Sequence, residues 1–198
     1  ICSLVNPTLI LEIGSWMGSS AVLWAKYASR SMGTAKVICV DTWLGSAEHY
    51  ERRDGTQFDI DCLRINEYGA SFFDDFLHNI YYAGVQDKVI PFRATSNSAL
   101  VFFAVNRLIF DVIYIDADHG ALSVMADLAG AFVVLSPTGL ICFDDFTWTS
   151  VRMGIRLFLL GQLFRHSTLE IWKRTDGSAI AFNVANPDRL RLAQDLKV

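Results

Sequence analysis

The sequence lacks several features that would each place it in a specialised class of protein. Its longest apolar stretch, residues 99–115, is interrupted by polar and charged residues and falls short of the ~18 uninterrupted residues that a membrane span needs. The four cysteines, at positions 2, 39, 62 and 142, are not paired at zinc-binding spacing. The Gly-x-Gly-x-x-Gly spacing of dinucleotide-binding turns is also absent.

An excess of positive charge is missing as well. The net charge is −4 and the isoelectric point is near 5.5, so we expect neither a nucleic acid nor a membrane as partner. With 198 residues, of which 52% are hydrophobic, the chain is long enough for one domain with a sizeable core, residues 1–198. Cysteines 39 and 142 lie in apolar runs, which indicates reduced core residues and a cytoplasmic setting. No signal-peptide pattern is found, and the chain begins at Ile1 rather than Met, so we expect a trimmed domain that lacks an N-terminal extension.

Apolar strand patterns alternate with helical patterns along the chain. Such alternation predicts a doubly wound α/β fold with a mostly parallel sheet. Pro91 lies within one strand pattern, which favours an edge position, and Asp176-Gly177 predicts a hairpin that makes the last strand antiparallel. The expected strands are 9–13, 36–41, 89–94, 110–116, 139–144, 169–173 and 179–183, and the expected helices are 19–32, 60–83, 98–106, 121–135 and 149–164.

The first strand pattern runs directly into a glycine turn and a helix. Its residues read Glu12-x-Gly14-x-x-x-Gly18, so a carboxylate and exposed backbone N–H groups meet at the carboxyl end of a strand. Open α/β sheets bind nucleotide-like ligands at such an edge. A tight strand–helix turn that binds nothing is the alternative.

Acidic residues close several of the expected strands. Asp41 ends the second strand, Asp116 the fourth, and Asp144 and Asp145 the fifth. Because parallel strands end at one edge of a sheet, the last three carboxylates are expected to converge, where they repel one another unless a proton or a cation neutralises them. Oxygen ligands select a hard divalent ion such as Mg²⁺, Ca²⁺ or Mn²⁺. The alternative is separate solvated acids, with Asp145 as the N-cap of the next helix.

These motifs together resemble a known family. Glu12-x-Gly14-x-x-x-Gly18 is similar to motif I of the class I S-adenosylmethionine (SAM) methyltransferases. Tyr114-Ile115-Asp116-Ala117-Asp118-His119 and Phe143-Asp144-Asp145-Phe146 resemble the metal-dependent O-methyltransferases, which include the catechol and caffeoyl-CoA type, the macrocin/novobiocin-type sugar enzymes and the related cephalosporin hydroxylase-like group. The resemblance implies a Rossmann-like seven-stranded sheet of order 3-2-1-4-5-7-6, with helices on both faces, and a metal held by Asp116, Asp144 and Asp145.

The resemblance also implies a SAM site and catalytic residues. Asp41 would bind the ribose, with Thr42 and Trp43 next to it, and the loop after the third strand would contact adenine. His119 stands where the catechol and caffeoyl-CoA enzymes carry a lysine base, so Asp116 and His119 are the expected catalytic residues. The expected cofactor-binding residues are Glu12, Gly14, Ser15, Gly18, Ser19, Ser20, Asp41, Thr42, Trp43, Thr95, Ser96, Asp116, Asp118 and His119.

The sequence thus predicts a SAM-dependent O-methyltransferase that uses a divalent metal to methylate a hydroxyl of a small molecule or sugar. Two alternatives stay open at this point, an NAD(P)-dependent oxidoreductase of Rossmann type and a non-catalytic domain of the methyltransferase fold. A homo-oligomer is compatible with the sequence, and the charged run at residues 48–54 is a candidate lid.

Overall fold

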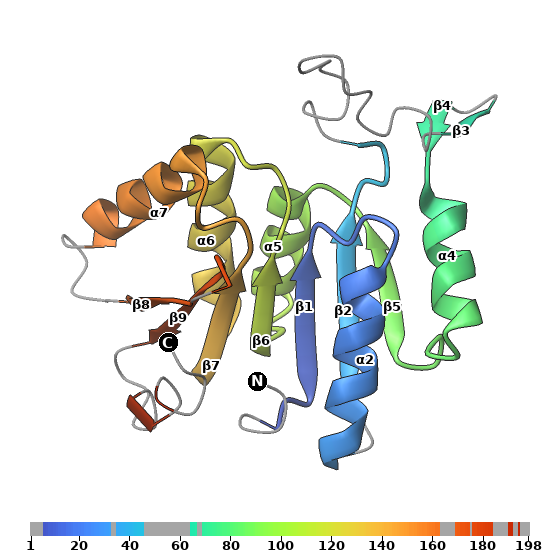
Figure 1. Cartoon of the computed structure of the whole chain (residues 1–198), viewed down its shortest axis with the longest axis horizontal. Coiled ribbons are helices and arrows are strands. Elements are labelled where there is room, and N and C mark those ends of the chain that lie inside the picture. Colours follow the sequence, from blue (N-terminus) through green and yellow to red (C-terminus); the bar gives the residue numbers. More distant parts are fainter. Residues whose placement is uncertain are drawn as a thin grey trace.

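The computed structural model describes residues 6–32, 35–45, 64–66, 69–162, 169–174, 176–183, 190–191 and 194. Its centre is a seven-stranded sheet with helices on both faces, and a two-stranded hairpin stands apart from that sheet (Figure 1). The strands are β1 Leu9–Ile13, β2 Lys36–Asp41, β3 Arg64–Asn66, β4 Gly69–Ser71, β5 Val89–Arg93, β6 Phe110–Ile115, β7 Leu135–Phe143, β8 Leu169–Lys173 and β9 Ala179–Asn183. The helices are α2 Ser19–Met32, α4 Phe73–Tyr82, α5 Ser96–Val105, α6 Ala121–Val134 and α7 Thr149–Gln162.

The order of the large sheet is β5-β2-β1-β6-β7-β9-β8. Counted along this sheet alone, that order is 3-2-1-4-5-7-6, so the predicted Rossmann-like topology is confirmed. β5, β2, β1, β6 and β7 are parallel, whereas β9 is antiparallel to both of its neighbours. The order reverses between β1 and β6, and open α/β sheets bind ligands beyond the carboxyl ends of the strands at such a point.

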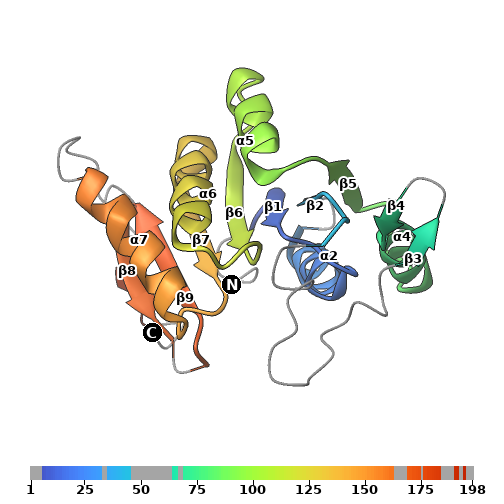
Figure 2. The same ribbon diagram turned by 90° about the horizontal axis from the view of Figure 1, so that it is seen from above.

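Each face of the sheet is covered by its own set of helices. Helices α2 and α4 pack on one face, and α5, α6 and α7 pack on the other (Figure 2). Alternate residues of β1 supply the two cores, because successive side chains of a strand point to opposite faces: Ile10 faces α2, whereas Leu11 and Ile13 face the other helices. Because both faces of the sheet are apolar, the central strands have nearly continuous hydrophobic sequences.

One expected element is wrong. Among the described residues of the predicted helix over 60–83, the helical ones begin at Phe73, and residues 64–66 and 69–71 form the antiparallel strands β3 and β4 instead. Gly69 lies in the middle of the predicted helix, where it would cost about 1 kcal/mol relative to alanine. The Ser71 hydroxyl accepts a hydrogen bond from the Phe73 N–H at 3.2 Å, which makes a local turn just before the helix. The end of α4 just before Gly84 agrees with the prediction.

Several smaller expectations are confirmed. β5, with Pro91, is an edge strand, and the Asp176-Gly177 hairpin joins β8 to β9. Cys39 and Cys142 are buried, and neither forms a disulfide bond.

Within the described part of the chain, no helix is long and apolar enough to cross a membrane. The candidate lid at residues 48–54 lies outside the described residues.

The turn after β1 makes a testable prediction about Gly14. Its backbone has φ +87°, which favours glycine, and a Cβ at this position would lie 2.0 Å from the Asp116 carbonyl oxygen. The neighbouring β6 cannot retreat, because the Asp116 N–H donates to the Ile13 carbonyl at 2.9 Å. Gly14→Ala should therefore lower the free energy of unfolding in urea by more than about 2 kcal/mol, or prevent folding.

Gly84 supplies the control for this measurement. It also has a positive φ, +67°, but a Cβ there would meet nothing within 4 Å. Gly84→Ala should therefore show the conformational cost alone, about 1–2 kcal/mol. Equal losses of unfolding free energy in the two variants would contradict the close approach of the turn to β6.

Candidate functional site

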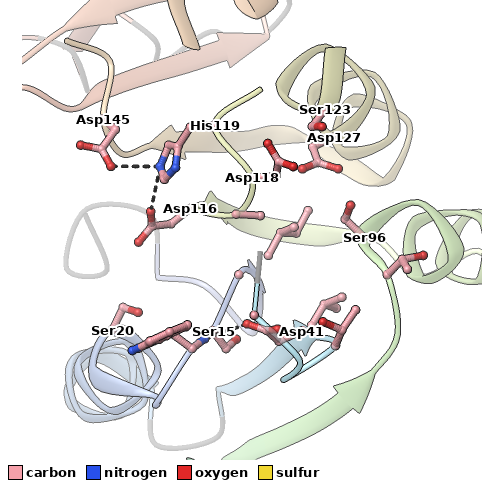
Figure 3. Close-up of a pocket in the computed structure, with 18 of the residues that line it drawn as sticks. Ser15, Ser20, Asp41, Ser96, Asp116, Asp118, His119, Ser123, Asp127 and Asp145 are labelled. Atoms are coloured by element: carbon pink, nitrogen blue, oxygen red, sulfur yellow. Dashed lines mark hydrogen bonds and ion pairs between the residues drawn. The ribbon is translucent and has the colours of Figure 1, made fainter. Parts of the chain in front are cut away.

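A cavity of about 790 Å³ opens at the carboxyl edge of the parallel strands (Figure 3). Its walls come from the turn after β1, the ends of β2, β5, β6 and β7, and the inner side of α6. Its size is in the range of small-molecule sites. Its polar and acidic lining comprises Ser15, Ser19, Ser20, Asp41, Thr42, Thr95, Ser96, Asp116, Asp118, His119, Ser123, Asp127 and Asp145.

Asp41 connects the two turns that form the floor of the pocket. Its Oδ2 accepts a hydrogen bond from the Trp16 N–H at 2.8 Å, and its Oδ1 accepts one from the Trp43 N–H at 2.8 Å. The Trp43 indole N–H in turn donates to the Trp16 carbonyl at 2.8 Å. A carboxylate has about four lone-pair sites, so each Asp41 oxygen can still accept from a ligand in the pocket.

The two tryptophans have different roles in this arrangement. Both have a left-handed backbone, with φ +46° at Trp16 and +54° at Trp43, which is uncommon for bulky residues. Trp16 lines the pocket. Trp43, which was expected beside the cofactor, is instead fully buried and packs on Phe73 and Phe76 of α4. Strained backbone of this kind persists where the surrounding contacts fix it.

Glu12 lies beneath the pocket rather than in its lining. Its side chain is fully buried on the α2 face, and desolvation raises its pKa from 4.5 to about 7. Ser15, Ser20 and Cys39 lie around the carboxyl group and partly offset that desolvation, but among the described residues none is aligned for a regular hydrogen bond. Ser15, Ser20 and Asp116, which interact with Glu12, do line the pocket, so Glu12 can act on it through them.

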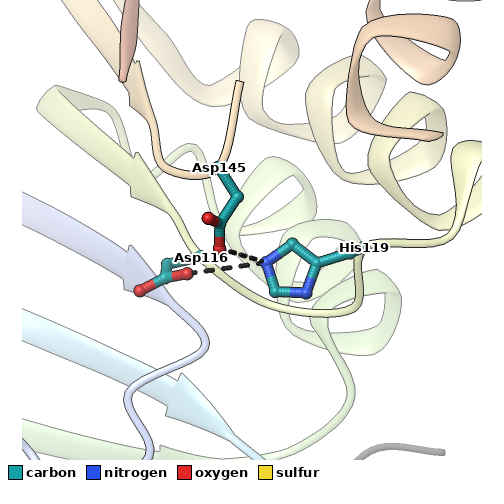
Figure 4. Close-up of side chains that lie close together, drawn as sticks. All are labelled: Asp116, His119 and Asp145. Atoms are coloured by element: carbon teal, nitrogen blue, oxygen red, sulfur yellow. Dashed lines mark ion pairs between the residues drawn. The ribbon is translucent and has the colours of Figure 1, made fainter. Parts of the chain in front are cut away.

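Three side chains meet at the end of the pocket formed by β6 and β7 (Figure 4). His119 Nε2 lies 3.0 Å from Asp145 Oδ2 and 3.9 Å from Asp116 Oδ1, and one ligand atom from each residue lies within 4.8 Å of the others. Burial, and then the nearby Asp144 charge, raises the pKa of Asp116 to about 6. The ring of Trp148 packs on the imidazole at 4.7 Å between centroids. An N,O,O set at this spacing can hold a divalent metal ion or orient a histidine base.

Asp144 does not belong to this group, although the sequence predicts it as a ligand. Its Oδ2 accepts a hydrogen bond from the Tyr114 hydroxyl at 2.8 Å, and the same hydroxyl lies 3.3 Å from Asp116 Oδ2. The backbone of Asp145 is left-handed, with φ +48°, so the chain turns sharply between the two acids and only Asp145 faces His119. Burial and the two aspartates raise the pKa of Tyr114 well above its usual range.

The opposite end of the pocket is formed by the start of α5 and the inner side of α6. Thr95 is the N-cap of α5, and its hydroxyl accepts from the Ser98 N–H at 3.3 Å. Ser96 follows it and lies close enough to Asp127 to lower the pKa of that carboxyl group, although burial raises this pKa to about 6. Asp118 turns back on its own loop, where Oδ1 accepts from the Gly120 N–H at 2.6 Å.

The structure thus gathers most of the predicted site residues around one cavity. Four of them do not line it: Glu12, Gly18, Trp43 and Asp144. Gly18 instead allows a close approach to α4, where a Cβ would meet the Phe76 ring at 3.0 Å. Sequence reasoning missed Ser123 and Asp127. A signal was present, because these residues are four apart on one helix face and Asp127 is the single charged residue of an otherwise apolar helix.

Glu12 generates a prediction about pH. A carboxyl group whose pKa is near 7 in the folded state and near 4.5 in the unfolded state binds its proton more tightly when folded, so stability falls as the pH rises from about 4.5 to about 7. Over that window the group should lose about 3 kcal/mol of stabilisation. Glu12→Gln removes this contribution, so its melting temperature should fall less than that of the parent between pH 5 and pH 8. If the melting temperatures of the two proteins changed by the same amount between pH 5 and pH 8, Glu12 would not be a buried carboxyl group that titrates in this range.

Comparison with solved structures gives the same fold. An O-methyltransferase from Bacillus cereus, solved in complex with S-adenosylhomocysteine (SAH), is similar with a TM-score of 0.59 and 20% identity, over 91% of this chain and 76% of that one. The O-methyltransferase TomG from Streptomyces achromogenes, which is involved in tomaymycin synthesis and was solved with SAM, gives 0.61 and 16%, over 92% and 75% of the two chains. SAH-bound methyltransferase PaMTH1 from Podospora anserina gives 0.60 and 17%, over 92% and 74%.

Comparison with curated protein sequences finds no match. A comparison with protein families does find one. The model described as a methyltransferase domain matches residues 11–146, from within β1 to the loop that follows Asp145. That stretch is more than half of the chain and contains both ends of the pocket. The chain therefore belongs to the methyltransferase domain family.

Proposed function

We propose that this chain is a SAM-dependent O-methyltransferase that acts on a hydroxyl group of a small molecule, with a divalent metal at Asp116, His119 and Asp145. The observation that carries the proposal is the single cavity that joins the glycine turn, Asp41 and this three-residue group. The structural neighbours that were solved with SAM or SAH support the choice of cofactor.

The polar groups of the pocket fit the parts of SAM. The turn that Gly14 begins and the serines at the start of α2 can receive the methionine part, and the free lone pairs of Asp41 can accept from a ribose diol. Bound SAM supplies a methyl group on a positively charged sulfur. The acidic lining suits that charge, because no lysine or arginine is among the described residues that line the pocket.

The chain's own residues supply alignment and proton handling. Methyl transfer requires the substrate oxygen, the methyl carbon and the sulfur in line, so positioning and the exclusion of water are the main tasks of the protein. Asp116, His119 and Asp145 would hold a divalent cation, which would lower the pKa of a bound hydroxyl. Without a cation, His119 would instead be the base that accepts the hydroxyl proton, and Asp145 would hold its imidazole in place.

The SAM site is tested by Asp41→Ala. Because the carboxylate would accept charge-assisted hydrogen bonds from the ribose and also fixes the turn at Trp16, SAH should bind about tenfold more weakly, or worse, by isothermal titration calorimetry. Asp111→Ala is a matched control. Asp111 also accepts several hydrogen bonds, from Thr8 and Leu9, but at the amino end of β6. If both variants bind SAH like the parent, Asp41 does not hold the cofactor.

The metal is tested by thermal shift with Mg²⁺ and Mn²⁺. A cation that binds only the folded protein should raise its melting temperature, and Asp145→Asn should abolish that rise. Asp144→Asn, at the adjacent position, should keep it, because Asp144 faces Tyr114 instead of His119. A parent protein that shows no shift, and whose methyl transfer survives exhaustive chelation but not His119→Ala, would overturn the metal and favour histidine as the base.

A further inference from the structure

Tyr114 lies beside the group of Asp116, His119 and Asp145 but has no part in the proposed function. It is near the end of β6 and is not among the residues that line the pocket. Its ring packs on Trp24 of α2, with 5.6 Å between the ring centroids, so the body of the side chain is anchored in the core on that face of the sheet. The hydroxyl of a tyrosine held in this way usually has a hydrogen-bond partner.

The pairing of β6 with β7 brings the Tyr114 hydroxyl to Asp144. Tyr114 is opposite Cys142 in the register of the two strands, and Asp144 follows Cys142 by two residues. Because side chains alternate along a strand, Asp144 leaves the end of β7 on the same face as Tyr114. The hydroxyl donates to Asp144 Oδ2 at 2.8 Å and lies 3.3 Å from Asp116 Oδ2. A phenol has one proton, which it keeps at neutral pH, and the shorter contact with Asp144 is the stronger hydrogen bond.

The Asp144 side chain in turn holds the backbone of Asp145. Asp144 Oδ1 accepts a hydrogen bond from the Asp145 N–H at 2.8 Å. Asp144 is exposed, so hydrogen bonds rather than packing fix the position of its carboxylate. The Asp145 backbone is left-handed, with φ +48°, a conformation that is unfavourable for residues other than glycine. A fixed acceptor for the Asp145 N–H therefore helps to hold this turn.

The turn decides where the Asp145 carboxylate lies. In an extended chain Asp145 would point to the face opposite that of Asp144 and Asp116. Figure 4 shows instead that the Asp145 and Asp116 carboxylates are both directed at His119. Asp145 Oδ2 lies 3.0 Å from His119 Nε2. The left-handed residue thus brings the second acid of the pair to the imidazole.

We propose that Tyr114 is a positioning residue: by holding the Asp144 carboxylate, its hydroxyl fixes the turn at Asp145 and so places the Asp145 carboxylate against His119. The inference rests on the proposed function, since Asp145 and His119 belong to the group proposed to hold the metal or to supply the base. Outer partners of this kind orient the residues that ligate a metal, and their loss typically weakens metal binding by roughly 10–100-fold.

Tyr114→Phe tests the inference, because it removes the hydroxyl and keeps the ring that packs on Trp24. In a crystal structure of the metal-free variant, the Asp145 carboxylate should no longer lie at hydrogen-bond distance from His119. Mn²⁺ should bind the SAH-loaded variant about tenfold more weakly by calorimetry. SAH itself should bind as it does to the parent, because Tyr114 does not line the pocket. Tyr81→Phe, which removes the same atom from an exposed tyrosine of α4, should change none of these measurements.

Two variants of Asp144 test the path of the effect. Asp144→Ala removes both hydrogen bonds of the carboxylate, so it should weaken Mn²⁺ binding as Tyr114→Phe does, and the double variant should bind no more weakly than either single one. Asp144→Asn should bind Mn²⁺ like the parent, because its amide oxygen can accept from the Asp145 N–H and its amide N–H can donate to the tyrosine oxygen. Losses that add in the double variant would overturn the inference, because the hydroxyl would then act directly on Asp116.

The outcomes separate this inference from the proposed function. A structure of Tyr114→Phe in which the Asp145 carboxylate still lies within about 3.2 Å of His119 would overturn the inference, whatever the affinity for Mn²⁺. If that variant fails to fold, Asp144→Ala takes its place in this comparison, because it truncates an exposed side chain. A parent protein that binds SAH but not Mn²⁺ would remove the metal from the proposed function, and the position of Asp145 in the variant would still decide the inference.

Discussion

The site depends on one carboxylate that holds two loops together. Each oxygen of Asp41 accepts a backbone N–H, one from the turn after β1 and one from the turn after β2. The indole of Trp43 closes the arrangement by donating to Trp16, and its ring is packed between α4 and the sheet. The hydrophobic core thus fixes the loops directly, and two unusual left-handed tryptophans are held in place for a ligand. Removing this carboxylate would release both walls of the pocket together.

The sequence predicted the sheet well because its strands are buried on both faces and therefore read as apolar runs. It also placed Asp41 and Asp116 correctly at the pocket, since the carboxyl ends of parallel strands share one edge. The roles of Asp144 and Asp145 could not be read from sequence, because a single left-handed residue decides which of the two acids faces His119. Asp127 carried a signal in its isolated charge on a helix, but its closeness to Ser96 joins two helices and exists only after folding. The helix over 60–83 failed where glycine and short polar residues favoured a hairpin.

Buried acids recur around this pocket. Glu12, Asp116 and Asp127 all have raised pKa values, and in each case desolvation is the largest cause. Together they reduce the stability of the empty protein at neutral pH, because each ionised form is poorly solvated. Perturbed carboxyl groups gathered at a cavity are typical of functional sites, where a ligand supplies the missing partners. The same groups that make the pocket acidic should therefore make ligand binding strongly stabilising.

Pro91 of β5 affects whether the open edge of the sheet can pair with a strand of another molecule. In the β5–β2 pairing, the Ala94 N–H donates to the Asp41 carbonyl. Because backbone N–H groups alternate in direction along a strand, every second residue before Ala94 points its N–H toward β2. Pro91 is not one of these residues, so its nitrogen faces the open side of the strand. That side would otherwise present a row of free donors and acceptors, which can pair with an exposed strand of another chain. Pro91 removes a donor from the middle of the row, and the exposed Arg93 adds a charge at its end. This edge of the sheet is thereby protected against the addition of an eighth strand and the aggregation that such pairing begins.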